Sequence, residues 1–247
     1  MRAEEIEAIE RATVAAVSPQ AQEEIAGWLL PFDDGTVGRA KSAVPLSHES
    51  CDLALLDDIE ARYAAREVPA MLRIPGVAAF DPWREALARR GYAPGRPTHV
   101  ETAATRDVLR VADGARVVTA PQPDAGWASV FTGEGFDPVD GASRMARLAR
   151  TPAALFASVH EDGATVAAGM AAFSHGWASV HGMRTARHCR GRGLAGQVLS
   201  ALAQAALERG YENMFLQVEA QNTAARALYR RAGFAHAWTY TYWKKEK

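Results

Sequence analysis

The segment from Arg190 to Gly196, with the sequence RGRGLAG, constrains the fold of this chain more than any other segment. It follows a stretch at 178–183 that is typical of a buried strand, and it precedes residues 194–209, whose apolar side chains recur at helical spacing. Glycine permits backbone conformations with positive φ, and the first amides of a helix lack an intrahelical acceptor. Strand, glycine-rich loop and helix in this order predict an α/β protein that binds an anion at the loop.

The charge distribution supports a small anionic ligand and argues against general nucleic-acid binding. The net charge is −1, with 13 lysines and arginines against 18 acidic residues in 1–110 and 15 against 11 in 111–247. No Asp or Glu occurs from 163 to 207, the window that contains the arginine-rich loop. We therefore expect the basic second half to bind an anionic cofactor, and the acidic first half to attract cationic amines.

Turn residues and apolar periodicity predict the other elements. In the first half we expect helices at 3–17, 53–66 and 81–90, a hairpin turning at 33–35, and strands at 69–74 and 99–103, the last after a loop at 94–97. In the second half we expect helices at 125–132, 141–149 and 223–231, with strands at 154–160, 165–173, 213–219 and 234–243. Residues 163–183 lack Asp, Glu, Lys and Arg over 21 positions, but the His-Gly pair within them predicts two strands and a turn instead of a membrane span.

The glycine spacing also fits a dinucleotide-binding loop, with Glu219 as the acid that would bind the ribose. That interpretation requires an apolar strand running directly into Gly191, whereas residues 184–190 are polar and basic. Only 28 residues follow Glu219, too few to complete a doubly wound sheet. An NAD-binding oxidoreductase is therefore the weaker alternative, and a loop that merely caps a helix is another.

A second motif lies one helix and one strand further along the chain. The loop carries the pattern Arg/Gln-x-x-Gly-x-Gly/Ala at Arg190, Gly193 and Ala195, and residues 216–234 read LQVEAQNTAARALYRRAGF. Together the two motifs resemble those of the Gcn5-related N-acetyltransferase (GNAT) superfamily, over about residues 113–247. The resemblance implies a mixed, mostly antiparallel, twisted sheet flanked by helices, with a splayed strand and a pyrophosphate-binding loop.

The resemblance also implies the cofactor, acetyl-CoA, and the residues that hold it. Amides of the loop would bind the pyrophosphate, the end of the preceding strand would bind the pantetheine arm, and the Met183 amide would stabilise the oxyanion. Asn222 would cap the last helix and touch the cofactor. The implied cofactor-binding residues are Met183, Arg184, Thr185, Arg190, Gly191, Arg192, Gly193, Leu194, Ala195, Asn222, Ala225 and Tyr229. No metal is expected.

Three residues are candidates for proton transfer. Tyr229 matches the family tyrosine that protonates the departing thiolate. His181, on the same strand face as Met183, is a candidate base, and Glu219 is the alternative. Gln217 stands where acetyltransferases of a ribosomal-protein alanine carry a glutamate, which argues against a protein N-terminus as acceptor.

The first half resembles a degenerate second copy of the same unit. A shift of 142 residues superposes Arg84 on Arg226, Arg89 on Arg231, Gly91 on Gly233 and Tyr92 on Phe234. Leu87 then stands in the position of Tyr229 and has no proton to give. We therefore predict tandem GNAT-like units: a degenerate unit at 1–112 and a catalytic domain at 113–247.

Taken together, the sequence predicts an N-acetyltransferase that transfers the acetyl group of acetyl-CoA to a primary amine by direct attack. The acceptor is a small-molecule or peptide amine that the sequence does not identify, with no nucleic-acid or membrane partner expected. We expect a cytoplasmic monomer or homodimer. The alternative from another class is a non-catalytic acyl-CoA sensor, which would bind the cofactor without turnover.

Overall fold

The computed structural model describes residues 1–49, 52–133 and 137–245. Its helices are α1 (Ala3–Ala15), α2 (Leu55–Ala64), α3 (Asp81–Arg89), α4 (Thr105–Leu109), α5 (Ala125–Thr132), α6 (Pro138–Leu148), α7 (Leu194–Glu208) and α8 (Thr223–Arg231), with 3₁₀ turns η1 (Gly38–Ala40), η2 (Ala78–Phe80) and η3 (Arg187–Cys189). Its strands are β1 (Ala21–Ile25), β2 (Trp28–Phe32), β3 (Val44–Pro45), β4 (Met71–Pro75), β5 (Tyr92–Ala104), β6 (Val117–Ala120), β7 (Ala154–Glu161), β8 (Ala164–Ser174), β9 (Trp177–Thr185), β10 (Asn213–Glu219) and β11 (Ala235–Lys245). No helix among the described residues is long and apolar enough to span a bilayer.

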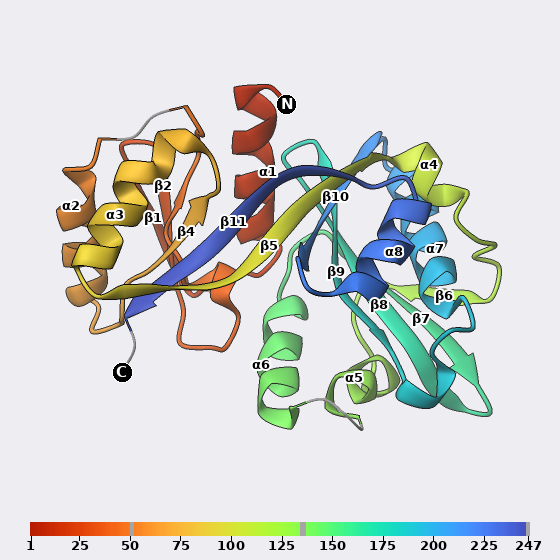
Figure 1. The fold of residues 1–247 in the computed structure, drawn as a ribbon. Helices are drawn as coiled ribbons and strands as arrows, with labels where there is room; N and C mark the ends of the chain where they lie inside the picture. Colours follow the sequence, from red (N-terminus) through yellow and green to blue (C-terminus); the bar gives the residue numbers. More distant parts are fainter. Residues whose placement is uncertain (50–51, 134–136, 246–247) are drawn as a thin grey trace.

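One eight-stranded sheet runs through the molecule in the order β4-β11-β5-β10-β9-β8-β7-β6, and β1, β2 and β3 form a small second sheet. Every neighbouring pair in the large sheet is antiparallel except β9 and β10, which are parallel. Figure 1 shows the long strands β5 and β11 crossing between the part that contains α2 and α3 and the part that contains α5 to α8. The predicted α/β class with a mostly antiparallel sheet flanked by helices is confirmed.

The two halves of the chain exchange strands within this sheet. The segment β4-α3-β5 repeats as β10-α8-β11 at the shift of 142 residues: Asp81–Arg89 corresponds to Thr223–Arg231, and both β4 and β10 begin at corresponding residues. The order in the sheet is β4-β11-β5-β10. The last strand of the second half, β11, therefore lies between β4 and β5 of the first half, and β5 lies between β11 and β10 of the second half. The predicted division at residue 112 falls between α4 and β6, and one sheet continues across it.

Each half has its own apolar core. In the second half, α7 buries Val198, Leu199 and Leu202 against the sheet. In the first half, the Trp28 ring stacks on Trp83 with centroids 4.5 Å apart, between β2 and α3. Burying rings and aliphatic side chains of this size is the main stabilising contribution of such layers.

Two predictions for the first half are wrong. The hairpin turns at Ala26-Gly27, where both residues have positive φ, and not at 33–35. Residues 94–97, predicted as a loop, belong to β5. The prolines there are tolerated because β5 pairs with β10 only from Thr98 onward, so residues 92–97 pair with β11 alone. The prediction of two strands and a turn within 163–183 is confirmed by β8 and β9.

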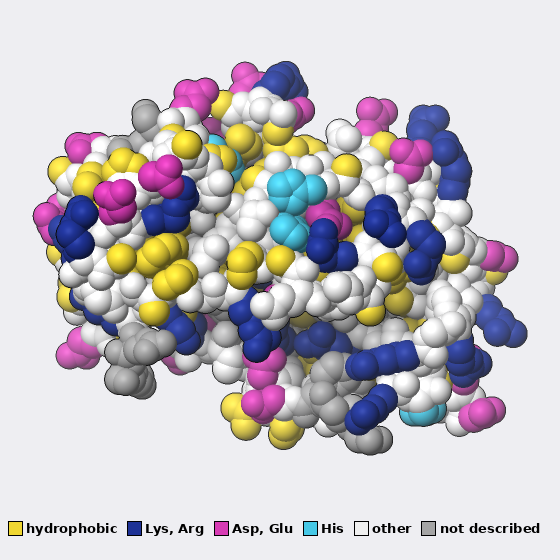
Figure 2. Space-filling view, in the orientation of Figure 1, with side chains coloured by type: hydrophobic (Ala, Val, Ile, Leu, Met, Phe, Trp, Pro, Cys, Tyr) yellow, Lys and Arg dark blue, Asp and Glu magenta, His cyan; other side chains and the backbone are white. Residues whose placement is uncertain are grey.

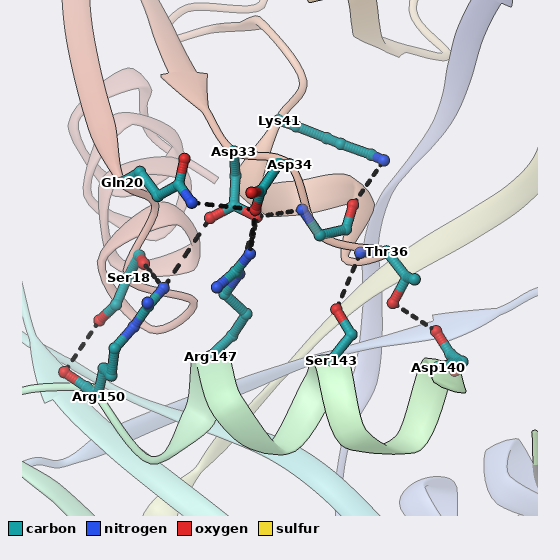
Figure 3. A network of polar contacts seen from close by, with 11 residues as sticks. Ser18, Gln20, Asp33, Asp34, Thr36, Lys41, Asp140, Ser143, Arg147 and Arg150 are labelled. Atoms are coloured by element: carbon teal, nitrogen blue, oxygen red, sulfur yellow. Dashed lines mark hydrogen bonds and ion pairs between the residues drawn. The ribbon is translucent and has the colours of Figure 1, made fainter. Parts of the chain in front are cut away.

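A buried ion pair joins α6 to the loop after β2 (Figure 3). The Arg147 Nε donates to Asp33 Oδ1 at 2.8 Å, and an Arg147 Nη2 lies 2.7 Å from Asp34 Oδ1. The Asp33 side chain is fully buried, and it also accepts from the Gly35 amide at 2.7 Å. A buried carboxylate requires such partners, so this contact fixes the N-terminal segment against α6 beside the site described next.

Candidate active site

The site begins where β9 and β10 separate. Their parallel pairing covers only Ala178–Val180 and Met214–Leu216, although β9 continues to Thr185 and β10 to Glu219. Beyond Val180 the two strands therefore diverge and expose their facing edges. A strand edge of this kind offers unpaired amides and carbonyls to an extended ligand. The predicted splayed strand is confirmed.

A β-bulge sits on β9 at the opening of this gap. The register with β8 passes from Ala168↔Arg184 to Met170↔His181, so Gly182 and Met183 together oppose Gly169. Gly182 has a φ of +62°, and a Cβ on Gly169 would lie 2.4 Å from the Met183 sulfur. The two glycines leave room for the bulge. The extra residue of the bulge rotates the backbone at Met183 relative to a regular strand.

The glycine-rich loop lies between η3 and α7 on the same side of the sheet. Gly191 and Gly193 have φ values of +78° and +79°, and Gly193 is the N-cap of α7. At neither glycine would a Cβ meet any atom within 4 Å, so the space beside them is open. Within the described part of the chain, the amides from Gly191 to Ala195 donate to no backbone carbonyl. Amides without a backbone acceptor at a helix N-terminus are suited to an anionic group.

Two adjoining cavities connect the loop to the gap between the strands. One of about 510 Å³ contacts the loop, and one of about 270 Å³ lies between the strand ends. They share Met183, Arg184, Asn222, Ala225 and Tyr229. All the residues predicted to hold the cofactor line one or both cavities, except Arg192.

The Arg192 side chain turns away from the cavities. Its guanidinium forms a bidentate ion pair with Glu161, with Nη1–Oε2 and Nη2–Oε1 distances of 2.8 and 2.9 Å. The side chain of Arg192, which the resemblance implies is a cofactor-binding residue, is therefore held on Glu161. Only the backbone of Arg192 remains in the loop to face an anion. On the outer surface, basic side chains gather over α8, which carries Arg226, Arg230 and Arg231 (Figure 2).

Tyr229 lies at the junction of the two cavities on α8. Asn222 begins that helix as its N-cap, and its Oδ1 accepts from the Ala225 amide at 3.1 Å. The Tyr229 side chain is almost fully buried, and burial, with the negative Glu101 nearby, raises its pKa to about 12. The phenol is therefore protonated throughout the physiological pH range and available as a hydrogen-bond donor.

His181 lies deeper, with both ring nitrogens occupied. Its Nε2 is 2.8 Å from Ser179 Oγ, and its Nδ1 is 3.4 Å from Arg39 Nη1. A guanidinium only donates, so Nδ1 accepts and Nε2 carries the proton. Burial and the adjacent Arg39 hold the pKa of His181 well below its usual value. This geometry does not favour the predicted role of His181 as the base.

Glu219, the other candidate base, ends β10 and lines the 270 Å³ cavity. Its carboxylate is more than half exposed and lies 3.3 Å from Arg96 Nη1. It is the only carboxylate side chain among the described residues lining that cavity.

The sequence does not identify three residues that line this cavity from outside the two motifs. Val17 and Arg39 come from the N-terminal segment, and Arg144 comes from α6 in the second half. Gln217 connects them: its Oε1 accepts from Tyr240 Oη at 2.9 Å and from Arg39 at 3.3 Å, and its Nε2 donates to Thr13 Oγ1 at 3.0 Å. No local motif predicts such contacts, because Arg39 and Gln217 are 178 residues apart in sequence.

Strands that diverge beside a glycine-rich helix N-terminus define the fold class of the GNAT acetyltransferases. Solved structures with this fold support the assignment. A GCN5-related N-acetyltransferase from Kribbella flavida aligns with a TM-score of 0.73 at 18% identity, covering 98% of this chain and 96% of its own. A tandem GNAT protein from the clavulanic acid biosynthesis pathway aligns with a TM-score of 0.62 at 16% identity, covering 95% of this chain and 86% of its own.

The sequence comparisons identify the family more closely. The uncharacterized N-acetyltransferase YobR of Bacillus subtilis (strain 168) is 28% identical over 240 residues, covering 94% of this chain and 95% of its own. The family model described as "Probable histone acetyltransferase Rv0428c C-terminal" matches residues 3–243. The chain belongs to this acetyltransferase family, within the GNAT superfamily.

Proposed function

We propose that the protein binds acetyl-CoA in the two adjoining cavities and transfers its acetyl group to a primary amine by direct attack. The observation that carries the proposal is the continuity between the open glycine loop and the gap between β9 and β10. Tyr229, Met183 and Asn222 line both cavities at their junction. The catalytic unit is the segment 113–247, with 1–112 as a degenerate unit that shapes the acceptor side.

The residues of the loop suit the anionic end of the cofactor. The open space beside Gly191 and Gly193 admits a pyrophosphate to the amides at the start of α7. Arg190 and the neighbouring cavity residue Arg231 add positive charge. The exposed edge of β9 from Met183 to Thr185 would hold the amide-containing arm of the cofactor, as an added strand does.

When bound, acetyl-CoA supplies an activated thioester whose acetyl carbon accepts the amine. The Met183 amide, turned by the bulge, would donate to the acetyl oxygen as negative charge develops there. Tyr229 would donate its phenolic hydrogen to the sulfur as the carbon–sulfur bond breaks. With a pKa of about 12, Tyr229 is a weaker acid than an ordinary phenol. Its hydroxyl therefore acts first as a hydrogen-bond donor, with complete proton transfer energetically uphill.

Glu219 is the base in this proposal. It lines the acceptor side of the smaller cavity, and its carboxylate can take a proton from the incoming ammonium. His181 instead acts as a positioning residue, because its Nδ1 accepts from Arg39 and its Nε2 side is occupied by Ser179.

Calorimetry and a thiol-release assay together test the proposal. We expect acetyl-CoA and CoA to bind with micromolar dissociation constants, and free CoA to appear at rates that depend on the added amine. NADH should produce no binding heat. Binding of acetyl-CoA without amine-dependent release would identify a sensor, and the absence of binding would exclude both functions.

A further inference from the structure

A third cavity, of about 350 Å³, adjoins the site on the side away from the glycine loop. It shares Val37, Arg39, Arg144, Gln217 and Glu219 with the 270 Å³ cavity. The rest of its lining comes from the N-terminal segment and from β4, β5 and β11, including Thr98, Tyr240, Tyr242 and Lys244. An acceptor would therefore approach through a space built by both halves of the chain.

The feature of this space that needs an explanation is Arg39. The residue is half-buried where the two cavities meet, and the hydrogen-bonding neighbours of its guanidinium are neutral: His181 Nδ1 at 3.4 Å and Gln217 Oε1 at 3.3 Å. Among the described residues no carboxylate forms an ion pair with it. Both contacts use Nη1, so within the same residues the Nε and Nη2 donors have no hydrogen-bond acceptor. An arginine removed from bulk water normally pairs with an anion.

The neighbouring contacts hold Arg39 in place without neutralising it. Tyr240 Oη and Thr13 Oγ1 fix the Gln217 amide with its oxygen toward Arg39. Ser179 fixes the imidazole of His181 in the same way. Gln217 and His181 are therefore neutral groups in fixed orientations that hold the Arg39 guanidinium in place. A cation held in this way is positioned to bind an anionic ligand.

The other charged groups along this space are mostly positive or already paired. Arg144 forms an ion pair with Asp140 at 2.6 Å, and Glu219 with Arg96 at 3.3 Å. Lys244 lines the outer end. The expectation from net charge, that cationic amines are attracted here, does not hold at the level of the cavity. A lysine within a basic protein tail would carry further positive charge toward Arg39.

We propose that Arg39 binds a carboxylate of the acceptor, so that the acceptors are amino acids, with the amine and the carboxylate a few bonds apart. The inference rests on the proposed function, because it assigns the second functional group of the amine substrate. Arg39 contacts His181 at 3.4 Å, and His181 precedes Met183 by only two residues on β9. A small amino acid can span that separation, with its carboxylate on Arg39 and its nitrogen at the thioester. The planar guanidinium fork matches a carboxylate in geometry.

Matched pairs of acceptors test the proposal. Thiol release is measured with phenylalanine and phenethylamine, tryptophan and tryptamine, and 4-aminobutyrate and propylamine, each at saturating acetyl-CoA. For at least one pair we expect kcat/KM for the carboxylated member to exceed that for its partner by about 30-fold or more, the usual cost of leaving a desolvated charge unpaired. Arg39→Gln should abolish this ratio through KM, and Arg39→Lys should retain part of it. Arg89→Gln, an exposed arginine on α3, is the control that should keep the ratio.

Binding of the products separates this inference from the proposed function. N-acetylphenylalanine and N-acetylphenethylamine are titrated into CoA-saturated protein by calorimetry. Preferential binding of the carboxylate that is lost in Arg39→Gln, without turnover of any amine, would uphold the inference and reject the acetyltransferase function. Turnover with equal kcat/KM for both members of every pair, or a ratio unchanged in Arg39→Gln, would overturn the inference and leave the function standing.

Discussion

Tyr229 is the residue on which the proposed chemistry depends most. It lies where the two cavities meet, it is nearly fully buried, and its hydroxyl makes no hydrogen bond within the described chain. Because Tyr229 lines both cavities, a ligand in them can supply the acceptor for this hydroxyl. The departing sulfur of the cofactor would be that acceptor.

Tyr229→Phe removes only this hydroxyl. We expect kcat to fall by about 100-fold or more, because a positioned proton donor contributes that much to catalysis. The dissociation constant for CoA should change by less than about 3-fold, since the ring and its edge-on contact with Phe234 remain. Steady-state kinetics and calorimetry on the same preparation measure both quantities.

Tyr211→Phe provides the matched control for that variant. Tyr211 is a half-buried tyrosine of the same half that packs on Phe173 and lines none of the three cavities described above. It should retain wild-type turnover. Unchanged kcat in Tyr229→Phe would remove the tyrosine from the mechanism.

Which site residues the sequence predicts depends on how local their contacts are. Gly193 lies in the loop, and Asn222 and Tyr229 lie at the cap and on the body of α8, so short motifs identify them. Arg39 contacts His181 and Gln217, which are 142 and 178 residues away in sequence. Local sequence patterns do not predict contacts over such separations. The same reason explains why the turn at 33–35 was misread: Asp33 is there to pair with Arg147 on a distant helix.

Among the elements, α7 carries the loop that we propose binds the cofactor. A glycine with left-handed backbone flanks the helix at each end: Gly193 at a φ of +79° and Gly210 at +80°, both with open space for a Cβ. Alanine at either position costs about 1 kcal/mol of backbone strain. The two ends differ because only the N-terminal end presents free amides to an anion.

Gly193→Ala is therefore expected to raise the dissociation constant for CoA by about 10-fold or more, because a methyl group would stand between the amides and the pyrophosphate. Both variants should lower the melting temperature by similar amounts, because the backbone strain is the same. Gly210→Ala should leave CoA binding unchanged. Calorimetry and thermal unfolding compare the pair. Equal affinities in both variants would show that the loop does not bind the cofactor.

The sequence predicts the bounds of an element correctly where local signals mark both of its ends. The bounds of β10 and α8 agree with the sequence-based prediction, since an apolar strand, an Asn cap and a Gly stop mark them. β5 was predicted too short because Pro94 and Pro97 are typical of a loop. Their place in β5 depends on pairing with β11, a strand more than a hundred residues later.

At the scale of the whole molecule, the exchange of β5 and β11 makes the halves interdependent. β5 lies between β10 and β11, so a chain of residues 113–247 alone would lack the strand that joins its last strand to its sheet. We expect this segment to be insoluble or to show no cooperative unfolding, and to recover CoA binding when co-expressed with residues 1–112. A segment 113–247 that folds alone and binds CoA with wild-type affinity would contradict this expectation.

Acetyl transfer at the junction of the cavities is tested by following the acetyl group itself. Acetyl-CoA labelled with ¹³C in the acetyl group is incubated with the protein and a panel of amines, and the products are analysed by mass spectrometry. We expect a catalytic, more than stoichiometric yield of an N-acetylated amine carrying the label, and a much lower yield with Tyr229→Phe. Label that stays in acetyl-CoA, or a yield that Tyr229→Phe leaves unchanged, would contradict it.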